Sequence, residues 1–121
     1  MDEHPDVRLA RKLVKEALGL VRQANRFSLV VIDCPPSLGI LTLNTFVAAD
    51  TLLVPLQCEY YSLEGISMLT RVLDQLRTSG VSPRLEITGV LMTMYDGRTH
   101  LSDDVVNEVR KHFPEQVFKT I

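Results

Sequence analysis

Residues 28–37 read SLVVIDCPPS. The first five form a continuous apolar run rich in β-branched side chains, which is typical of a strand buried on both faces of a parallel sheet. The run ends in Asp33, and the prolines at 35 and 36 then hold the following backbone extended. The stretch therefore predicts a buried strand over residues 28–32 whose end carries a carboxylate on a rigid turn.

Along the rest of the chain, two kinds of segment alternate. In one kind, apolar side chains recur every three or four residues, and in the other they form short continuous runs. Gly80 and Pro83 are expected to end one of the helices. Strands that alternate with helices imply right-handed crossovers, so the expected fold class is α/β with a parallel sheet flanked by helices. Helices are expected over residues 6–24, 39–48, 62–78 and from Ser102 to Lys111, and further strands over residues 52–56, 85–92 and 117–121.

Composition limits the classes of protein to which the chain can belong. The 121 residues are 45% hydrophobic and 23% charged, which suits one soluble globular domain with a core. The formal net charge of −2 gives no bulk basic surface for nucleic acid, although a local basic patch is compatible with it. Cys34 and Cys58 lack metal-ligand spacing, so no zinc site is expected. With no signal peptide and no apolar run near the roughly 20 residues that cross a bilayer, we expect a cytoplasmic protein.

A polar segment follows each of three expected strands at once: residues 33–37 (DCPPS), 57–61 (QCEYY) and 93–99 (TMYDGRT). Parallel strands end at the same edge of a sheet, and ligands bind in the crevice beyond those ends. We therefore expect the three segments to converge on one site. Asp33, held rigidly and partly desolvated at a strand end, is the candidate for contact with magnesium or a magnesium-bound water, because magnesium in phosphate sites takes one or two carboxylates and keeps several waters.

Each of these segments could also have a purely structural role, and the residues alone do not decide between the two interpretations. Asp33 could simply cap a turn. Arg98 either contacts a phosphate through its guanidinium group or is a solvated surface charge. The acidic and tyrosine side chains after the second strand either line a site or partner surface or cover the edge of the core; they are Glu59, Tyr60, Tyr61 and Glu64.

Three longer motifs resemble the ParA/Soj partition ATPases, deviant-Walker P-loop ATPases related to MinD. Residues 30–44 (VVIDCPPSLGILTLN) resemble the family's Walker B and switch II segment, and residues 55–69 (PLQCEYYSLEGISML) resemble the segment that follows it. Residues 89–113 (GVLMTMYDGRTHLSDDVVNEVRKHF) resemble the next strand, loop and helix. The resemblance runs from about Phe27 to Ile121. Three long matches in the right order and spacing are highly specific, whereas a lone IDCPP would be weak.

The resemblance implies roles for particular residues. Asp33 would be the Walker B aspartate, acting on magnesium through water. Arg98 resembles a basic position that the family uses for non-specific DNA binding. The other implied positions are Pro35, Pro36, Ser37 and Gly39 in switch II; Glu59, Tyr60 and Glu64 at a dimer or partner interface; and Met94, Tyr95 and Asp96 on the adenine side of the nucleotide pocket.

The chain departs from the family in one respect. The family's Walker A loop, which cradles phosphates with glycines and a lysine, is absent, since none of the six glycines precedes a lysine. The resemblance therefore implies that residues 1–121 form a single incomplete domain, the Walker B and switch II half of a Rossmann-like P-loop NTPase fold, with the missing loop upstream of Met1. We expect the chain alone to be inactive as an ATPase.

For the intact protein, the resemblance implies an enzyme that binds ATP and magnesium, forms a homodimer in its ATP state and binds nucleoid DNA non-specifically. A ParB-like centromere-binding protein would stimulate its ATP hydrolysis. One alternative is a catalytically inactive module that docks a ParB-like partner or full-length ParA. Another is a MinD-like membrane-positioning ATPase, but residues 59–65 (EYYSLEG) favour the ParA branch, and no membrane contact is expected.

Overall fold

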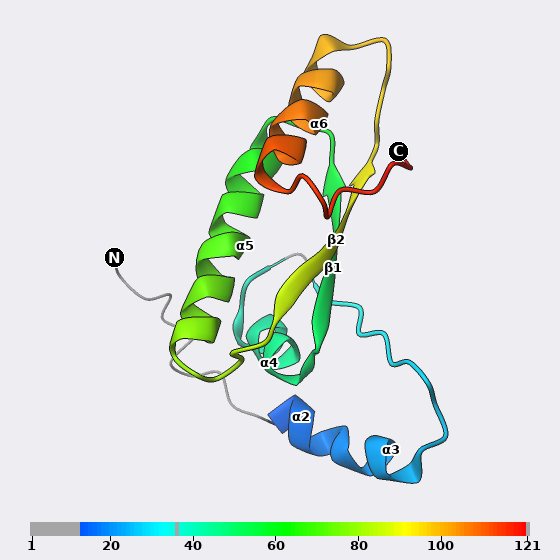
Figure 1. Ribbon diagram of the computed structural model, residues 1–121, viewed down its shortest axis with the longest axis vertical. Helices are drawn as coiled ribbons and strands as arrows, with labels where there is room; N and C mark the ends of the chain where they lie inside the picture. The colour runs from blue at the N-terminus through cyan, green and yellow to red at the C-terminus, as the bar shows by residue number, and fades with distance from the viewer. Residues whose placement is uncertain (1–12, 36, 121) are drawn as a thin grey trace. The chain divides into compact units, whose positions relative to one another are not determined.

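The computed structural model describes residues 13–35 and 37–120 (Figure 1). These residues fall into two compact units. The first unit contains residues 13–50 and 72–85, and the second contains residues 51–71 and 86–120. In chain order the elements are α2 (Leu13–Ala17), α3 (Gly19–Ala24), α4 (Ile40–Ala48), β1 (Thr51–Gln57), α5 (Tyr61–Thr78), β2 (Glu86–Thr93) and α6 (His100–His112).

Two parallel strands form the sheet of the second unit. β1 and β2 lie side by side and end together, with Gln57 paired to Thr93 (Figure 1). Parallel strands require a long crossover, which α5 provides between them. The strands expected over residues 52–56 and 85–92 are thereby confirmed, as is the parallel α/β class.

The pairing of the two strands is irregular near their start. The register shifts between Leu52 and Leu53, which pair with Ile87 and Gly89. Thr88 is therefore the extra residue of a bulge, and its hydroxyl donates a hydrogen bond to the Leu52 carbonyl oxygen at 3.3 Å. A bulge increases the local twist of a strand.

The last described residues of the second unit lie against β2. Val117 forms a parallel bridge with Val90, and the Phe118 amide donates to the Val90 carbonyl oxygen at 3.0 Å. The Phe118 ring covers Gly89, because a Cβ placed on that glycine would lie 2.5 Å from the ring's Cζ. The strand expected over residues 117–121 is present as this single bridge, and Ile121 lies outside the described residues.

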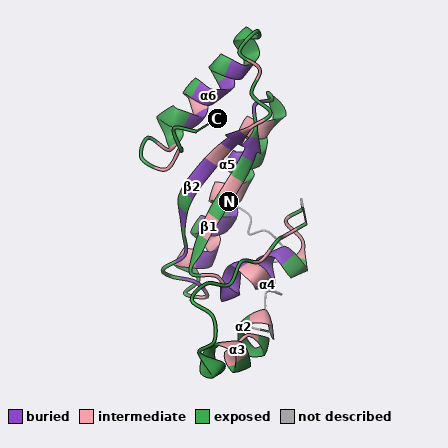
Figure 2. Cartoon of the chain, turned by 90° about the vertical axis from the view of Figure 1, so that its right-hand side faces the viewer, coloured by how far each residue is buried: buried purple, intermediate pink, exposed green. Residues whose placement is uncertain are grey.

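Helix α6 buries one side and exposes the other (Figure 2). The helix begins at His100, two residues before the expected start at Ser102, because Thr99 caps it. The Thr99 hydroxyl oxygen accepts a hydrogen bond from the Ser102 amide at 3.4 Å. Basic side chains occupy its last turn, where the negative end of the helix dipole favours them. Its buried side chains are Ser102, Val105, Val106 and Val109.

Helix α5 has the expected extent and the expected ending. Gly80 follows it with a positive φ of 77°, the left-handed conformation that glycine adopts at helix ends, and its amide donates to the Arg77 carbonyl oxygen. The chain then turns back, and the Ser82 amide donates to the Leu76 carbonyl oxygen at 3.0 Å. The glycine and proline signal at residues 80–83 is confirmed.

The first unit has its own apolar core. α4 matches the helix expected over residues 39–48 and buries Leu43, Phe46 and Val47. Leu76 at the end of α5 and Leu85 after the turn are also buried. α2 packs against α4. No helix of residues 13–35 and 37–120 is long and apolar enough to span a membrane.

The helix expected over residues 6–24 is divided. Residues 13–24 form α2 and α3, with a turn at Leu18 between them. Hydrogen bonds nevertheless continue across the turn, from the Leu18 amide to Val14 and from the Arg22 amide to Leu18. Residues 6–12 lie outside the described residues.

The strand expected over residues 28–32 is wrong for this structure. These residues form no strand, and Leu29 and Val31 are 77% and 81% exposed. A strand needs a neighbour that completes its backbone hydrogen bonds, and an apolar strand also needs cover on both faces. Neither is provided to residues 28–32 by the part of the chain that the structure describes.

Candidate functional site

The ends of β1 and β2 bring two of the expected polar segments together. Both strands end at the same edge, and the Cys58 amide donates to the Thr93 carbonyl oxygen at 3.0 Å just beyond the last strand pair. Residues 57–61 and 93–99 therefore leave the sheet side by side, as expected for parallel strands. Residues 33–37 belong to the first unit, and their convergence with this edge stays a prediction.

The loop after β2 turns sharply at its first residue. Met94 has a φ of 55°, which is uncommon for a residue other than glycine, and its side chain is 75% exposed. Beyond this turn, the Nε and Nη2 side of the Arg98 guanidinium group contacts one carboxylate: Nε donates to Asp96 Oδ1 and Nη2 to Asp96 Oδ2, each at 2.9 Å. The Arg98 amide also donates to Asp96 Oδ1 at 3.0 Å.

This ion pair changes the electrostatics of the loop. The hydrogen bonds from Arg98 lower the pKa of the Asp96 carboxyl group below its usual value, and they raise the pKa of the Arg98 guanidinium group. Arg98 is thus a solvated surface charge that is paired with Asp96, and its contact with a phosphate stays a prediction. A phosphate that binds Arg98 either replaces Asp96 at Nε and Nη2 or uses the Nη1 side of the guanidinium group, which Asp96 does not contact.

Tyr95 has a carboxylate partner on the next helix. Its hydroxyl donates to Asp103 Oδ1 at 2.5 Å, and this hydrogen bond is the main reason that the pKa of Tyr95 is raised. The ring also lies beside Gly97, where an added Cβ would be 3.4 Å from Tyr95 Cε1. The hydroxyl and the ring are therefore both held within the loop and the start of α6.

Backbone contacts close the same loop onto α6. The Asp96 amide donates to the Ser102 hydroxyl oxygen at 3.2 Å, and the Thr99 hydroxyl donates to the Asp96 carbonyl oxygen at 3.0 Å. Asp96 thus contributes its side chain to Arg98 and its backbone to the helix cap. The loop is pre-organised by its own contacts, with the Met94 side chain exposed at its beginning.

The segment after β1 presents its aromatic side chains to solvent. Tyr60 and Tyr61 are 70% and 80% exposed, and their rings meet edge to face with centroids 6.4 Å apart. The interpretation that they cover the edge of the core is therefore wrong for this structure. Glu59 and Glu64 are also exposed, whereas the neighbouring Cys58 is buried, and burial raises the pKa of its thiol.

Residues 33–35 and 37–39 precede α4 and belong to no helix or strand. Asp33 is exposed and does not end a strand, which corrects the expectation of a rigid, partly desolvated carboxylate. The Ser37 amide donates to the Pro35 carbonyl oxygen at 2.8 Å, and Gly39 is the residue that caps the helix N-terminus. Pro36 lies outside the described residues.

The chemistry of the available donors limits how a metal could be held. No group of three or more His, Cys, Asp or Glu side chains suited to a metal occurs among residues 13–35 and 37–120. Asp33 is one exposed carboxylate. It fits a magnesium ion that keeps most of its waters and takes its other ligands from nucleotide phosphates, and it does not fit a cage built from protein alone.

Two residues of this region had no role in the sequence-based prediction. Asp103 holds Tyr95 by accepting the hydrogen bond from the tyrosine hydroxyl. Thr99 caps α6. A threonine directly before a helix is a sequence signal for a helix cap, so the role of Thr99 could have been predicted. The contact between Asp103 and Tyr95 joins residues eight positions apart, and no sequence pattern indicates it.

The chain is similar to a known protein family and to several individual proteins. The family model described as AAA domain matches residues 4–87. Chromosome partitioning protein ParA of Myxococcus xanthus is 51% identical over 98 residues, which are 81% of this chain and 34% of that protein. Sporulation initiation inhibitor protein Soj of Bacillus subtilis is 45% identical over 108 residues, 89% of this chain and 42% of that protein.

A further relative and a solved structure agree with these matches. Chromosome-partitioning ATPase Soj of Thermus thermophilus is 50% identical over 95 residues, 78% of this chain and 38% of that protein. The crystal structure of cobyrinic acid a,c-diamide synthase from Mycobacterium smegmatis with bound ADP and magnesium has a TM-score of 0.68 and 41% identity, covering 81% of this chain and 39% of that one. The fold is therefore part of a P-loop NTPase fold, and the chain spans only 34% to 42% of the three curated relatives.

Proposed function

The chain belongs to the AAA domain family and, within it, to the ParA and Soj partition proteins, and we propose that it supplies the Walker B and switch II half of a partition ATPase. The intact protein would bind ATP and magnesium, close into a homodimer, bind nucleoid DNA non-specifically and hydrolyse ATP under stimulation by a ParB-like centromere-binding protein. The observation that carries this proposal is the meeting of residues 57–61 and 93–99 at the carboxyl edge of a parallel sheet.

The proposed catalytic contribution of this chain centres on Asp33. Bound ATP with magnesium would supply the phosphoryl group and the positive charge that stabilises it. The Asp33 carboxylate has no hydrogen bond or ion pair among the described residues, so its oxygens are free to accept hydrogen bonds from a magnesium-bound water. Residues 35–39, including Pro36, Ser37 and Gly39, would act as switch II and would pass a change to α4, which begins directly after Gly39.

The loop after β2 would serve two ligands. Met94, Tyr95 and Asp96 would lie on the adenine side of the nucleotide pocket, where the exposed Met94 side chain offers an apolar contact. Arg98 would contact DNA phosphates through the Nη1 side of its guanidinium group, or through Nε and Nη2 after a phosphate replaces Asp96. Binding of this kind recognises no base sequence and weakens steeply as salt rises.

The segment after β1 would form a protein interface. Glu59, Tyr60 and Glu64 lie at its exposed surface, and Tyr60 adds a large apolar area that interfaces favour. The same exposure supports a second candidate function, a catalytically inactive module that docks a ParB-like partner or full-length ParA. The two functions differ in whether ATP hydrolysis depends on this chain.

A chimera separates these two functions. The aligned residues of this chain would replace their counterparts in Bacillus subtilis Soj, to which they are 45% identical over 108 residues. If the chain is the Walker B half, the chimera releases phosphate from ATP in the presence of magnesium. A folded chimera that binds a ParB-like partner but hydrolyses no ATP would favour the docking module.

The 121 residues alone should have negligible ATPase activity, because their sequence contains no phosphate-binding loop. Phosphate release by the purified chain, measured against a mock preparation from the same host, checks this expectation. Magnesium-dependent turnover above the mock preparation would contradict it.

A further inference from the structure

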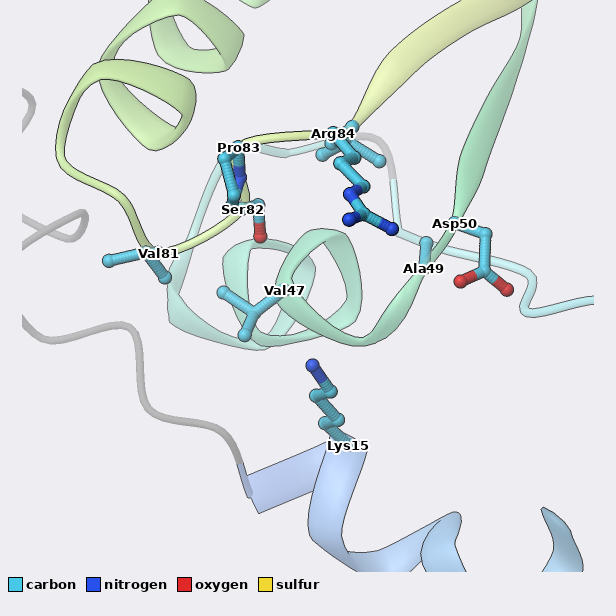
Figure 3. Close-up of a pocket in the computed structure, with 9 residues that line it drawn as sticks. Lys15, Val47, Ala49, Asp50, Val81, Ser82, Pro83 and Arg84 are labelled. Atoms are coloured by element: carbon cyan, nitrogen blue, oxygen red, sulfur yellow. The ribbon is translucent and has the colours of Figure 1, made fainter.

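A hollow of about 420 Å³ opens within the first unit, at the end of α4 and beside the turn over residues 81–85 (Figure 3). Val47, Val81 and neighbouring apolar groups form part of its wall. Its size lies in the range of sites for small ligands. None of the residues proposed above for nucleotide, magnesium, DNA or partner binding lines it.

The Ser82 hydroxyl is a buried polar group without a partner. Ser82 is 8% exposed, lines the hollow, and its Oγ makes no hydrogen bond. Its backbone, by contrast, is used fully: the amide donates to Leu76, and the carbonyl oxygen accepts from Leu85. The Oγ atom itself has almost no accessible area, so a ligand in the hollow reaches it only when the Ser82 side chain rotates toward the hollow. A buried hydroxyl without a partner is costly, which favours such a rotation when a ligand completes its hydrogen bonding.

Two cationic side chains line the same hollow. Lys15 extends from α2 toward the last turn of α4, and Arg84 extends from the turn after α5 (Figure 3). Neither takes part in a hydrogen bond or ion pair among residues 13–35 and 37–120. The one acidic residue in the lining, Asp50, lies 3.7 Å from Arg22 Nη2, which offsets its charge from outside the hollow. The lining therefore favours an anion.

We propose that this hollow binds a small organic phosphate, whose phosphate group is held by Lys15, Arg84 and the Ser82 hydroxyl. A phosphate dianion has the charge and the several acceptor oxygens that two cations and one hydroxyl donor require, whereas a single carboxylate uses fewer of them. The apolar part of the ligand would lie against Val47 and Val81. The proposal rests on contacts within the first unit and is independent of ATP hydrolysis.

Calorimetric titration of the full 121-residue chain tests the proposal with three probes: phenyl phosphate, inorganic phosphate and benzoate. The expected order of affinity is phenyl phosphate above inorganic phosphate above benzoate. Arg84→Gln should weaken phenyl phosphate roughly tenfold, the effect of losing a hydrogen bond from a charged donor. Arg71→Gln, which changes an exposed arginine that does not line the hollow, is the matched control and should leave the affinity unchanged.

Ser82→Ala provides a second readout that a purely structural role would not give. Without ligand, the variant should melt at the same temperature as the wild type or higher, because it loses an unsatisfied hydroxyl. The rise in melting temperature caused by phenyl phosphate should be smaller than in the wild type. Equal affinity of benzoate and phenyl phosphate, or unchanged phenyl phosphate binding in both Arg84→Gln and Ser82→Ala, would overturn the proposal. Asp33→Asn should not affect this binding, which separates its outcome from that of the proposed ATPase.

Discussion

Arg98 has its strongest partner within its own loop, two residues away. The bidentate contact with Asp96 occupies the Nε and Nη2 side of the guanidinium group and offsets its positive charge. Both side chains are exposed enough for this pair to exchange with a ligand, since Arg98 is 89% and Asp96 39% accessible at the side chain. Asp96 therefore limits how strongly Arg98 contacts DNA, in addition to any role near adenine.

This competition gives a prediction about DNA affinity. In the Soj chimera, Asp96→Asn should strengthen binding to random-sequence DNA because Arg98 is released, and Arg98→Gln should weaken it. Arg98→Gln should also reduce the slope of log affinity against log salt by about one. Fluorescence anisotropy at several salt concentrations measures both effects, with Arg71→Gln as the control. Equal affinity of the Asp96→Asn, Arg98→Gln and unmodified chimeras would remove Arg98 from the DNA interface.

Tyr95 gives a prediction about pH. Its pKa is raised above the usual 10.0, mainly by the hydrogen bond to Asp103, so the contact stabilises the fold below pH 10 and is lost as the pH rises through the higher folded pKa. Absorbance at 295 nm should show a late phase of tyrosine ionisation, at a pH above 10, that belongs to Tyr95. Tyr95→Phe should remove this late phase. A late phase that persisted in the variant would contradict the assignment to Tyr95.

Most elements could be predicted from the sequence because their signals are local. The ends of α4, β1, α5 and β2 lie within about a residue of the expected positions, since periodicity and end signals depend on neighbouring residues. The strand over residues 28–32 failed because strand formation depends on a partner outside the segment, and no apolar run can provide that by itself.

The candidate site was predictable to a similar degree. The side-by-side exit of residues 57–61 and 93–99 follows from parallel pairing, which the alternation of elements indicates. The contact of Arg98 with Asp96 was not predictable, because it depends on the turn at Met94 and on which of several acceptors the guanidinium reaches. The cover of Gly89 by Phe118 joins residues 29 positions apart, a separation at which sequence spacing carries no signal.

Gly89 gives a prediction about the β2 element. Gly89→Ala should destabilise the fold by about 1–3 kcal/mol, because the new methyl group would overlap the Phe118 ring and force it away from β2. Chemical denaturation monitored by circular dichroism measures the loss. Adding Phe118→Ala should make the Gly89→Ala change less costly than it is in the wild type. Additive effects of the two substitutions would show that the ring does not lie over this glycine in solution.

At the scale of the whole molecule, two compact units correspond to different parts of the proposed enzyme. Asp33 and the switch II segment are in the first unit, and the segments after β1 and β2 are in the second. The proposed ATPase requires that they act on one nucleotide. The chain spans 34% to 42% of the curated relatives compared here, so this requirement is best tested in a protein of their full length.

The most direct test is the magnesium-dependent ATPase activity of the Soj chimera carrying Asp33→Asn, compared with the chimera carrying Asp104→Asn. Asp104 is an exposed carboxylate on α6 that forms no ion pair among the described residues. We predict that Asp33→Asn lowers the rate of phosphate release by roughly tenfold or more, because metal-assisted charge stabilisation contributes several kcal/mol, and that Asp104→Asn leaves the rate unchanged. An Asp33→Asn chimera that hydrolyses ATP as fast as the Asp104→Asn control would contradict the assignment of this chain as the Walker B half.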